Sequence, residues 1–146
     1  MDEHDQLLYQ LIVEIRGAFH ELAALSDVMN ADVGITAAMR AVIETLHESG
    51  AQTVPQIALA KNVSRQHIQV LTDALAEKLL IRFQANPGHK RSKLLALSPA
   101  GEQVFSDIRR REAAALAELT KNFENRALFS TIATVAELRK AVRGLS

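Results

Sequence analysis

The feature that most constrains this sequence is a change of hydrophobic period between residues 81 and 97. Apolar and polar side chains alternate over residues 81–84 and again over residues 94–98, which is typical of half-buried strands. Asn86-Pro87-Gly88, between the two runs, is a turn signal. The segment is therefore predicted to be a two-stranded hairpin with a basic tip at residues 89–93. Its inward-facing residues are expected to be Ile81, Phe83, Leu95 and Leu97.

Elsewhere the apolar residues recur every three or four positions, which predicts α-helices. The first helix covers roughly residues 4–30 and contains Gly17, which should weaken it locally unless another backbone packs close there. Three more helices begin after residues suited to N-caps, and a fifth starts at Ser98-Pro99. The last follows a break near residues 122–125. The three middle N-caps are Thr36, Thr53 and Ser64.

The helix after Ser64 is predicted to be two-faced. The expected inward stripe consists of Ile68, Leu71, Leu75 and Leu79. The outward face is polar and consists of Arg65, Gln66, Gln69, Asp73 and Glu77. Two short helices joined by the tight turn Asn62-Val63 make a helix-turn-helix. The fold class is therefore mainly α with a small β-hairpin, in which a winged helix-turn-helix lobe spans residues 36–97.

Charge is unevenly distributed although the net charge is +0. Residues 1–60 hold nine acids against two bases, whereas residues 61–93 hold seven bases against two acids. A basic segment of this kind is typical of phosphate binding, although a solvated basic face is an equally good interpretation of charge alone. The chain has no cysteine, which excludes disulfides and thiolate metal sites within it. It shows no signal peptide and no membrane span, so a cytoplasmic location is expected.

The combination of a polar helix face and a basic hairpin predicts binding to duplex DNA. A helix fits the major groove, where Arg65 can pair with guanine and Gln66 or Gln69 with adenine. His67 can donate or accept a hydrogen bond there, and Ser64 caps the helix that carries these residues. The hairpin residues expected to meet phosphates or enter the minor groove are Lys90, Arg91 and Lys93. A merely solvated helix face is the alternative.

These residues resemble the MarR family of winged helix-turn-helix transcription regulators along essentially the whole chain. The most specific match is Lys90 to Gly101, which resembles the family's wing signature, and Val63-Ser64-Arg65-Gln66 resembles its recognition helix. The resemblance implies an obligate homodimer formed by the terminal helices, residues 4–30 and 99–146. It also implies a pseudo-palindromic operator and, often, repression relieved by a small aromatic or anionic ligand. Arg91 matches the arginine that enters the minor groove.

The sequence departs from the family pattern at three positions. His89 replaces an aspartate of the wing, Val70 stands where many members carry a basic residue, and Leu80 stands where glycine is common. The first two departures bear on the affinity for DNA, and the third bears on the turn into the first strand.

A ligand-binding cleft is a weaker prediction. Arg16 and His20 lie four residues apart on one helix, so they share a face, and Arg40 lies near the start of the next helix. The three could contact an anionic ligand, although surface salt bridging is the simpler interpretation.

Two other classes of function fit the sequence less well. Glu44 and His47 have the spacing of one half of a di-iron site, but no second pair exists, and neither a phosphate-binding loop nor a nucleophile elbow is present. No catalytic residue, metal or cofactor is therefore expected. A winged domain used only for protein–protein contact, without DNA binding, remains the alternative function.

Overall fold

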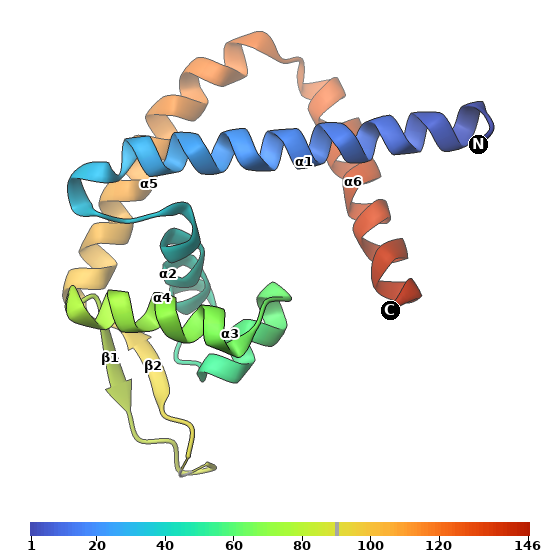
Figure 1. Ribbon diagram of the computed structural model, residues 1–146. Helices are drawn as coiled ribbons and strands as arrows, with labels where there is room; N and C mark the ends of the chain where they lie inside the picture. The colour runs from blue at the N-terminus through green and yellow to red at the C-terminus, as the bar shows by residue number, and fades with distance from the viewer. Residues whose placement is uncertain (90) are drawn as a thin grey trace. The chain divides into compact units, whose positions relative to one another are not determined.

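The computed structural model describes residues 1–89 and 91–146, which form two compact units, residues 1–108 and residues 109–146 (Figure 1). The first unit holds α1 (Glu3–Met29), the short 3-10 helix η1 (Ala31–Val33), α2 (Ala37–Ser49), α3 (Val54–Lys61), α4 (Arg65–Glu77), β1 (Ile81–Gln84), β2 (Leu94–Leu97) and the beginning of α5 (Pro99–Leu119). The second unit holds the rest of α5, the 3-10 helix η2 (Thr120–Asn122) and α6 (Asn125–Leu145). This order confirms the predicted fold class.

The helices of the first unit begin where the sequence places capping side chains. The Thr36 hydroxyl accepts a hydrogen bond from the Met39 amide at 3.2 Å, and Thr53 and Gln56 form a reciprocal capping box at the start of α3. The Ser64 hydroxyl accepts from the His67 amide at 3.0 Å. Each bond satisfies an amide that has no partner within its own helix. The predicted N-caps are thus confirmed.

The hairpin, called the wing below, is antiparallel and pairs Ile81 with Leu97 and Gln84 with Leu94. A backbone bridge from Gln52 to Leu95, with N···O distances of 3.0 and 2.7 Å, fastens β2 to the segment before α3. Figure 1 shows the wing extending away from the helices of the first unit, with the C-terminal end of α4 at its base. The wing is therefore held at its base and projects at its tip.

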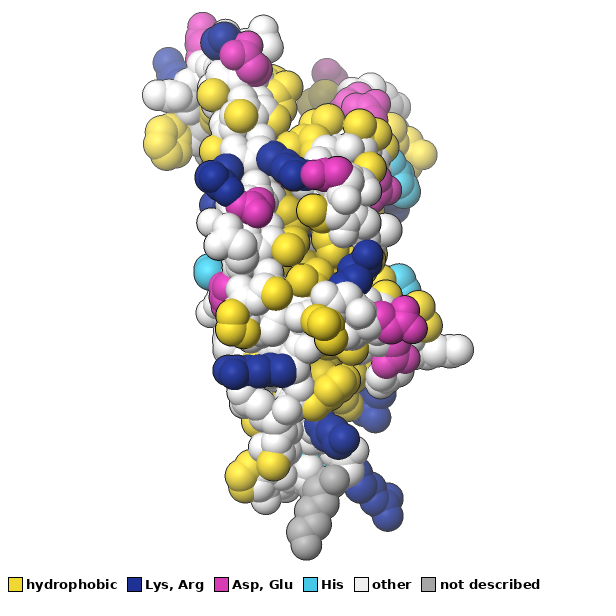
Figure 2. All heavy atoms as spheres, turned by 90° about the vertical axis from the view of Figure 1, so that its left-hand side faces the viewer, with side chains coloured by type: hydrophobic (Ala, Val, Ile, Leu, Met, Phe, Trp, Pro, Cys, Tyr) yellow, Lys and Arg dark blue, Asp and Glu magenta, His cyan; other side chains and the backbone are white. Residues whose placement is uncertain are grey.

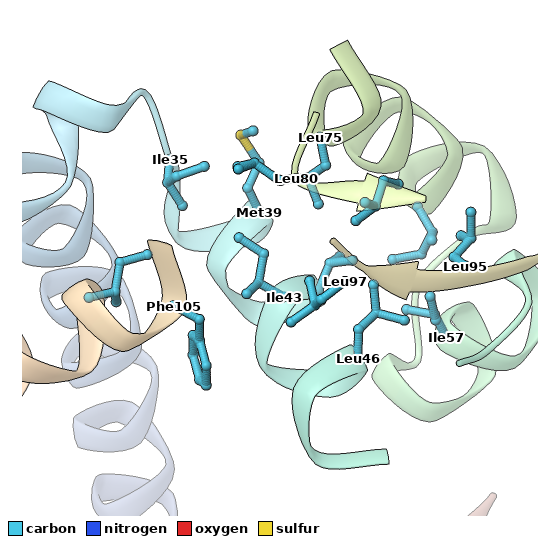
Figure 3. Packing of buried hydrophobic residues seen from close by; sticks show 14 of the residues in the cluster. Ile35, Met39, Ile43, Leu46, Ile57, Leu75, Leu80, Leu95, Leu97 and Phe105 are labelled. Carbon is cyan, nitrogen blue, oxygen red and sulfur yellow. The ribbon is translucent and has the colours of Figure 1, made fainter. Parts of the chain in front are cut away.

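One hydrophobic core holds the first unit together (Figure 3). In Figure 3, Leu97 of β2 lies next to Ile43 and Leu46 of α2, and Leu95 of β2 lies beside Ile57 of α3. The remaining fully buried side chains come from α2, α4, the η1–α2 segment and the start of α5. They include Ile35, Val42, Ile68, Leu75 and Ile108. Burial of such side chains contributes about 1.5–3 kcal/mol each relative to exposure.

The predicted inward stripe of α4 is wrong at Leu79, which is 75% exposed. α4 ends at Glu77, and Leu79 takes a left-handed conformation with φ 60°. The Leu79 amide bonds the Ala76 carbonyl at 2.9 Å, and the Leu80 amide bonds the Leu75 carbonyl at 3.0 Å. This is the Schellman ending of a helix. The chain reverses before the periodic pattern ends, so Leu80 enters the core in place of Leu79.

The expectation that Phe83 faces inward is also wrong, because its side chain is 50% exposed. Strand alternation places Phe83 on the same face as Ile81 and opposite the buried Leu95, but at this level the core covers β2, which is bonded to Gln52, and leaves the outer strand β1 uncovered. The Lys93 ammonium group lies 5.8 Å from the centre of the Phe83 ring, which is the geometry of a cation–π contact. Phe83 therefore contributes to the outer surface of the wing.

Candidate nucleic-acid interface

The outward face of α4 carries the predicted contact residues. Arg65, Gln66, His67 and Gln69 are all exposed, whereas Ile68, Thr72 and Leu75 on the opposite face are buried in the core. Anchoring through the buried face fixes the rotation of α4 about its axis. The polar side chains are consequently presented to solvent as one group.

The wing presents two of its three predicted cations. Arg91 and Lys93 are exposed, while the prediction for Lys90 falls outside the described residues. The approach to the tip is shaped by Asn86, whose side-chain oxygen accepts from the Gly88 amide at 3.2 Å. Figure 2 shows dark-blue Lys and Arg side chains at the lower end of the molecule, around the wing, with no magenta among the side chains drawn in colour there.

A hollow of about 470 Å³ lies between α4, the start of α3 and the wing. Its polar lining comes from α4 and the wing, and its apolar floor comes from α3, β1 and β2. The polar residues are Arg65, Gln66, Gln69, Arg91, Ser92 and Lys93, and the apolar residues are Val54, Pro55, Phe83 and Leu95. The structure thus brings five sequence-predicted positions into one concave surface, namely Arg65, Gln66, Gln69, Arg91 and Lys93.

The electrostatics of this surface favour an anion. Three cations, Arg65, Arg91 and Lys93, line the hollow, and the sequence contains no acid between Glu77 and Glu102. Cations on a concave wall attract a polyanion over several ångströms and position it at contact. Ser64 and His67 lie at the same end of α4 as Arg65, but they are not part of the lining.

One interaction on α4 was not anticipated from the sequence. The Gln69 side-chain amide donates to the Asp73 carboxylate at 2.8 Å, one helical turn further along. The spacing of four residues between an amide and a carboxylate on a helix was a sufficient signal for it.

The residues suggested for a ligand do not form a cluster. Arg16 and His20 are exposed on α1, and the Arg40 guanidinium is held by Glu44 within α2 at 2.7 and 3.4 Å. No contact among the three is found in the described part of the chain. For Arg40, the salt-bridge interpretation describes the observed geometry.

Glu44 and His47, which have the spacing of one half of a di-iron site, make other contacts. Glu44 pairs with Arg40, and the His47 ring lies 2.8 Å from a Glu102 oxygen and packs on Phe105 with ring centroids 4.8 Å apart. Among the described residues, no group of three or more His, Cys, Asp or Glu side chains is arranged to hold a metal ion. Within residues 1–89 and 91–146, no helix combines the length and apolarity that crossing a membrane requires.

Comparisons with known proteins identify the architecture. No protein-family model and no curated protein matches the sequence. Among solved structures, a MarR family transcription regulator is similar over 98% of this chain and 94% of its own, with 29% identity and a TM-score of 0.85. AbfR bound to DNA is similar over 98% of this chain and 96% of its own, with 18% identity and a TM-score of 0.78.

A cysteine-to-serine mutant of MarR from E. coli, complexed with operator DNA, is similar over 97% of this chain and 99% of its own, with 22% identity and a TM-score of 0.75. The last two likenesses establish the fold alone. Together with the anchored α4 and the basic wing, they define a winged helix-turn-helix protein. More narrowly, the chain has the fold of the MarR family of transcription regulators, a family without enzymatic activity, along nearly its whole length.

Proposed function

We propose that this protein is a homodimeric, DNA-binding transcription regulator of the MarR family that acts in the cytoplasm. The observation that carries the proposal is the hollow between α4 and the wing, where Arg65, Arg91 and Lys93 line one surface. α4 would lie in the major groove, and the wing would reach the flanking minor groove. AbfR and MarR of E. coli, whose structures contain DNA, share this fold.

The dimer is supported by the apolar surface that a single chain leaves uncovered. On α1, Leu7, Phe19 and Leu22 are 59–69% exposed, and on α6, Phe129 and Ile132 are 75% and 65% exposed. Uncovered apolar faces of this extent are typical of association surfaces, and two-fold dimers are the commonest assembly. We propose that helices within residues 4–30 and 99–146 form this interface and that residues 36–97 form the DNA-binding lobe. Two α4 helices would then read half-sites about one helical turn apart.

Repression relieved by a small aromatic or anionic ligand is the finer part of the proposal. Its support is the sequence resemblance, because the described residues do not bring Arg16, His20 and Arg40 together. A screen of small aromatic acids for loss of DNA binding tests it. A ligand that binds the free protein more tightly than the DNA complex lowers the affinity for DNA by the same factor.

The experiment that tests the central proposal is a fluorescence-anisotropy titration against DNA from around the protein's own gene, at two salt concentrations. Sequence-dependent binding that weakens steeply with salt supports a regulator, because phosphate contacts release counterions. Absence of binding even at low salt contradicts it and favours the protein-interaction module.

Two substitutions locate the surface. Arg91→Ala is expected to weaken binding to all sequences and to reduce the salt slope by about 1. Arg65→Ala is expected to cost about 1–3 kcal/mol and also to relax preference at one base pair. Lys121→Ala, which removes one exposed cation of the short helix η2, outside the DNA-binding lobe and outside α1, α5 and α6, is the control and should leave affinity nearly unchanged. If all three variants bind like the parent, the assigned surface is wrong.

A further inference from the structure

The hydrogen bond between Gln69 and Asp73 lies on the exposed face of α4 that borders the hollow. The Gln69 amide nitrogen donates to an Asp73 carboxylate oxygen at 2.8 Å, and both side chains are exposed. Gln69 itself lines the hollow together with Arg65 and Gln66. The pair therefore sits where the proposed function places base edges.

The bond fixes which way the Gln69 amide faces. A carboxylate can only accept hydrogen bonds, so the NH₂ group must be the end that faces Asp73. The carbonyl oxygen then faces away from Asp73, and one N–H of the NH₂ group stays free. An unpartnered glutamine amide can rotate by half a turn and exchange its donor for its acceptor, whereas the bond to Asp73 favours one of the two orientations of this amide.

A fixed order of donor and acceptor matters in the major groove. An A·T pair presents its acceptor and donor in the reverse order across the groove from a T·A pair. A glutamine amide that pairs with adenine donates to N7 and accepts from the N6 amino group. An amide held in one orientation therefore fits one of the two pairs better than the other.

We propose that Asp73 is a positioning residue that holds the Gln69 amide in one orientation and so sharpens the choice of base pair at the position Gln69 contacts. This proposal rests on the proposed function, because it concerns how the same surface reads DNA. Asp73 itself need not touch the DNA.

The test uses Asp73→Asn in the full-length protein. Asparagine has nearly the same shape but can both donate and accept, so it releases the amide from its single orientation. The DNA probe is a duplex carrying the site that the parent selects from a random pool, together with duplexes changed at one base pair each. Gln69→Ala identifies the base pair that Gln69 reads. Affinities come from competition anisotropy.

At that base pair we expect Asp73→Asn to reduce the parent's discrimination about 1.4- to 2.3-fold, which corresponds to an intrahelical bond of about 0.2–0.5 kcal/mol. Asp73→Glu keeps a partner that can only accept, and its discrimination should equal that of the parent within the error of replicate competition titrations. In the Gln69→Ala background, Asp73→Asn should change no preference. In the DNA-free protein, the Gln69 side-chain amide resonances should shift in Asp73→Asn.

The matched control is Asp107→Asn on α5, where Gln103 donates to Asp107 at 3.1 Å with the same four-residue spacing. It makes the same change of charge and weakens the same kind of bond outside α4, and it should leave base preference unaltered.

Three results would overturn the proposal while leaving DNA binding intact. Asp73→Asn could change affinity equally for all duplexes, which would make Asp73 only a nearby charge. It could change preference at another base pair even without Gln69, which would make Asp73 a base reader. Gln69→Ala could leave every base preference unchanged, which would mean that Gln69 reads no base pair and that Asp73 orients nothing of consequence. If the parent binds no duplex, the proposed function fails and this inference fails with it.

Discussion

Gly101 lies where α5 starts beside the turn between α4 and β1. A methyl group added there would overlap the Leu80 carbonyl oxygen and lie 3.1 Å from the Leu80 carbonyl carbon and 3.3 Å from a Leu97 methyl group. The Leu80 carbonyl oxygen already accepts a hydrogen bond from the Ser98 amide at 3.0 Å. Because the obstacle is hydrogen-bonded backbone, it cannot move as a flexible side chain would.

Gly101→Ala is expected to destabilise the protein by about 1–3 kcal/mol, as overpacking does in a closely packed site. Urea denaturation at fixed protein concentration measures this as a lower midpoint with an unchanged slope. Gly17→Ala is the control, since no atom lies within 4 Å of the added methyl group and Gly17 lies on the opposite side of α1 from Ile15 and Phe19. It should raise stability by about 0.5–1 kcal/mol. Equal stability of Gly101→Ala and the parent would contradict the close approach.

At the residue scale, predictions succeed where the deciding contact is local in sequence. The caps Ser64 and Thr53 are predictable from the sequence, because each bonds an amide only three residues away. Leu79 and Phe83 were misplaced because their exposure depends on where a helix ends and on how far the core extends under the wing. The turn does not require glycine at position 80, since its left-handed residue is Leu79, while Leu80 is buried. The need for glycine at position 101 was likewise not predictable, because the Leu80 carbonyl that a side chain there would meet is distant in sequence.

At the scale of elements, α3 and α4 form one helix-turn-helix motif, because backbone hydrogen bonds hold the turn between them. Asn62 takes a left-handed conformation with φ 54°, and the Val63 amide bonds the Ala58 carbonyl at 3.1 Å. Ser64 then begins α4 at once. The start of the DNA-facing helix is thus set by one side chain, and the sequence was sufficient to identify it.

Ser64→Ala is expected to lower the free energy of unfolding by about 1 kcal/mol, because the His67 amide loses its acceptor at the helix end. Thermal or urea denaturation checks the value, and faster hydrogen exchange of the first amides of α4 checks its location. Ser64→Asn keeps a capping oxygen and should restore most of the loss. A uniform change of exchange along the whole chain would argue against a local capping role.

At the scale of the whole molecule, apolar residues recur every three or four positions along the first and last helices and leave an apolar surface uncovered. Such a surface is expected to be covered by another chain, and the resemblance implies a second copy. The sequence could not place the two compact units relative to each other. Hydrophobic periodicity shows which face of a helix is apolar, but it does not show which element packs against that face. The structure describes each unit separately and supports the dimer through exposed residues such as Phe19 and Ile132.

Ile132→Glu is expected to shift the protein from dimer to monomer by at least tenfold in the dissociation constant, because a carboxylate would be buried in an apolar contact. Sedimentation velocity across a concentration series measures the shift. DNA affinity should fall with it, since two linked half-site contacts become one. Leu59→Glu, at a side chain that is 85% exposed on α3, is the matched control for oligomeric state. A parent that is already monomeric would refute the dimer.

Ser98 has a mechanical consequence. Its hydroxyl donates to the Leu79 carbonyl at 2.7 Å and accepts from the Gly101 amide at 3.0 Å, while its own amide bonds the Leu80 carbonyl. These three hydrogen bonds join the end of α4, the base of the wing and the start of α5 at one residue. We therefore expect α4 and the wing to move together when the start of α5 is displaced, and we expect the base of the wing not to act as a hinge.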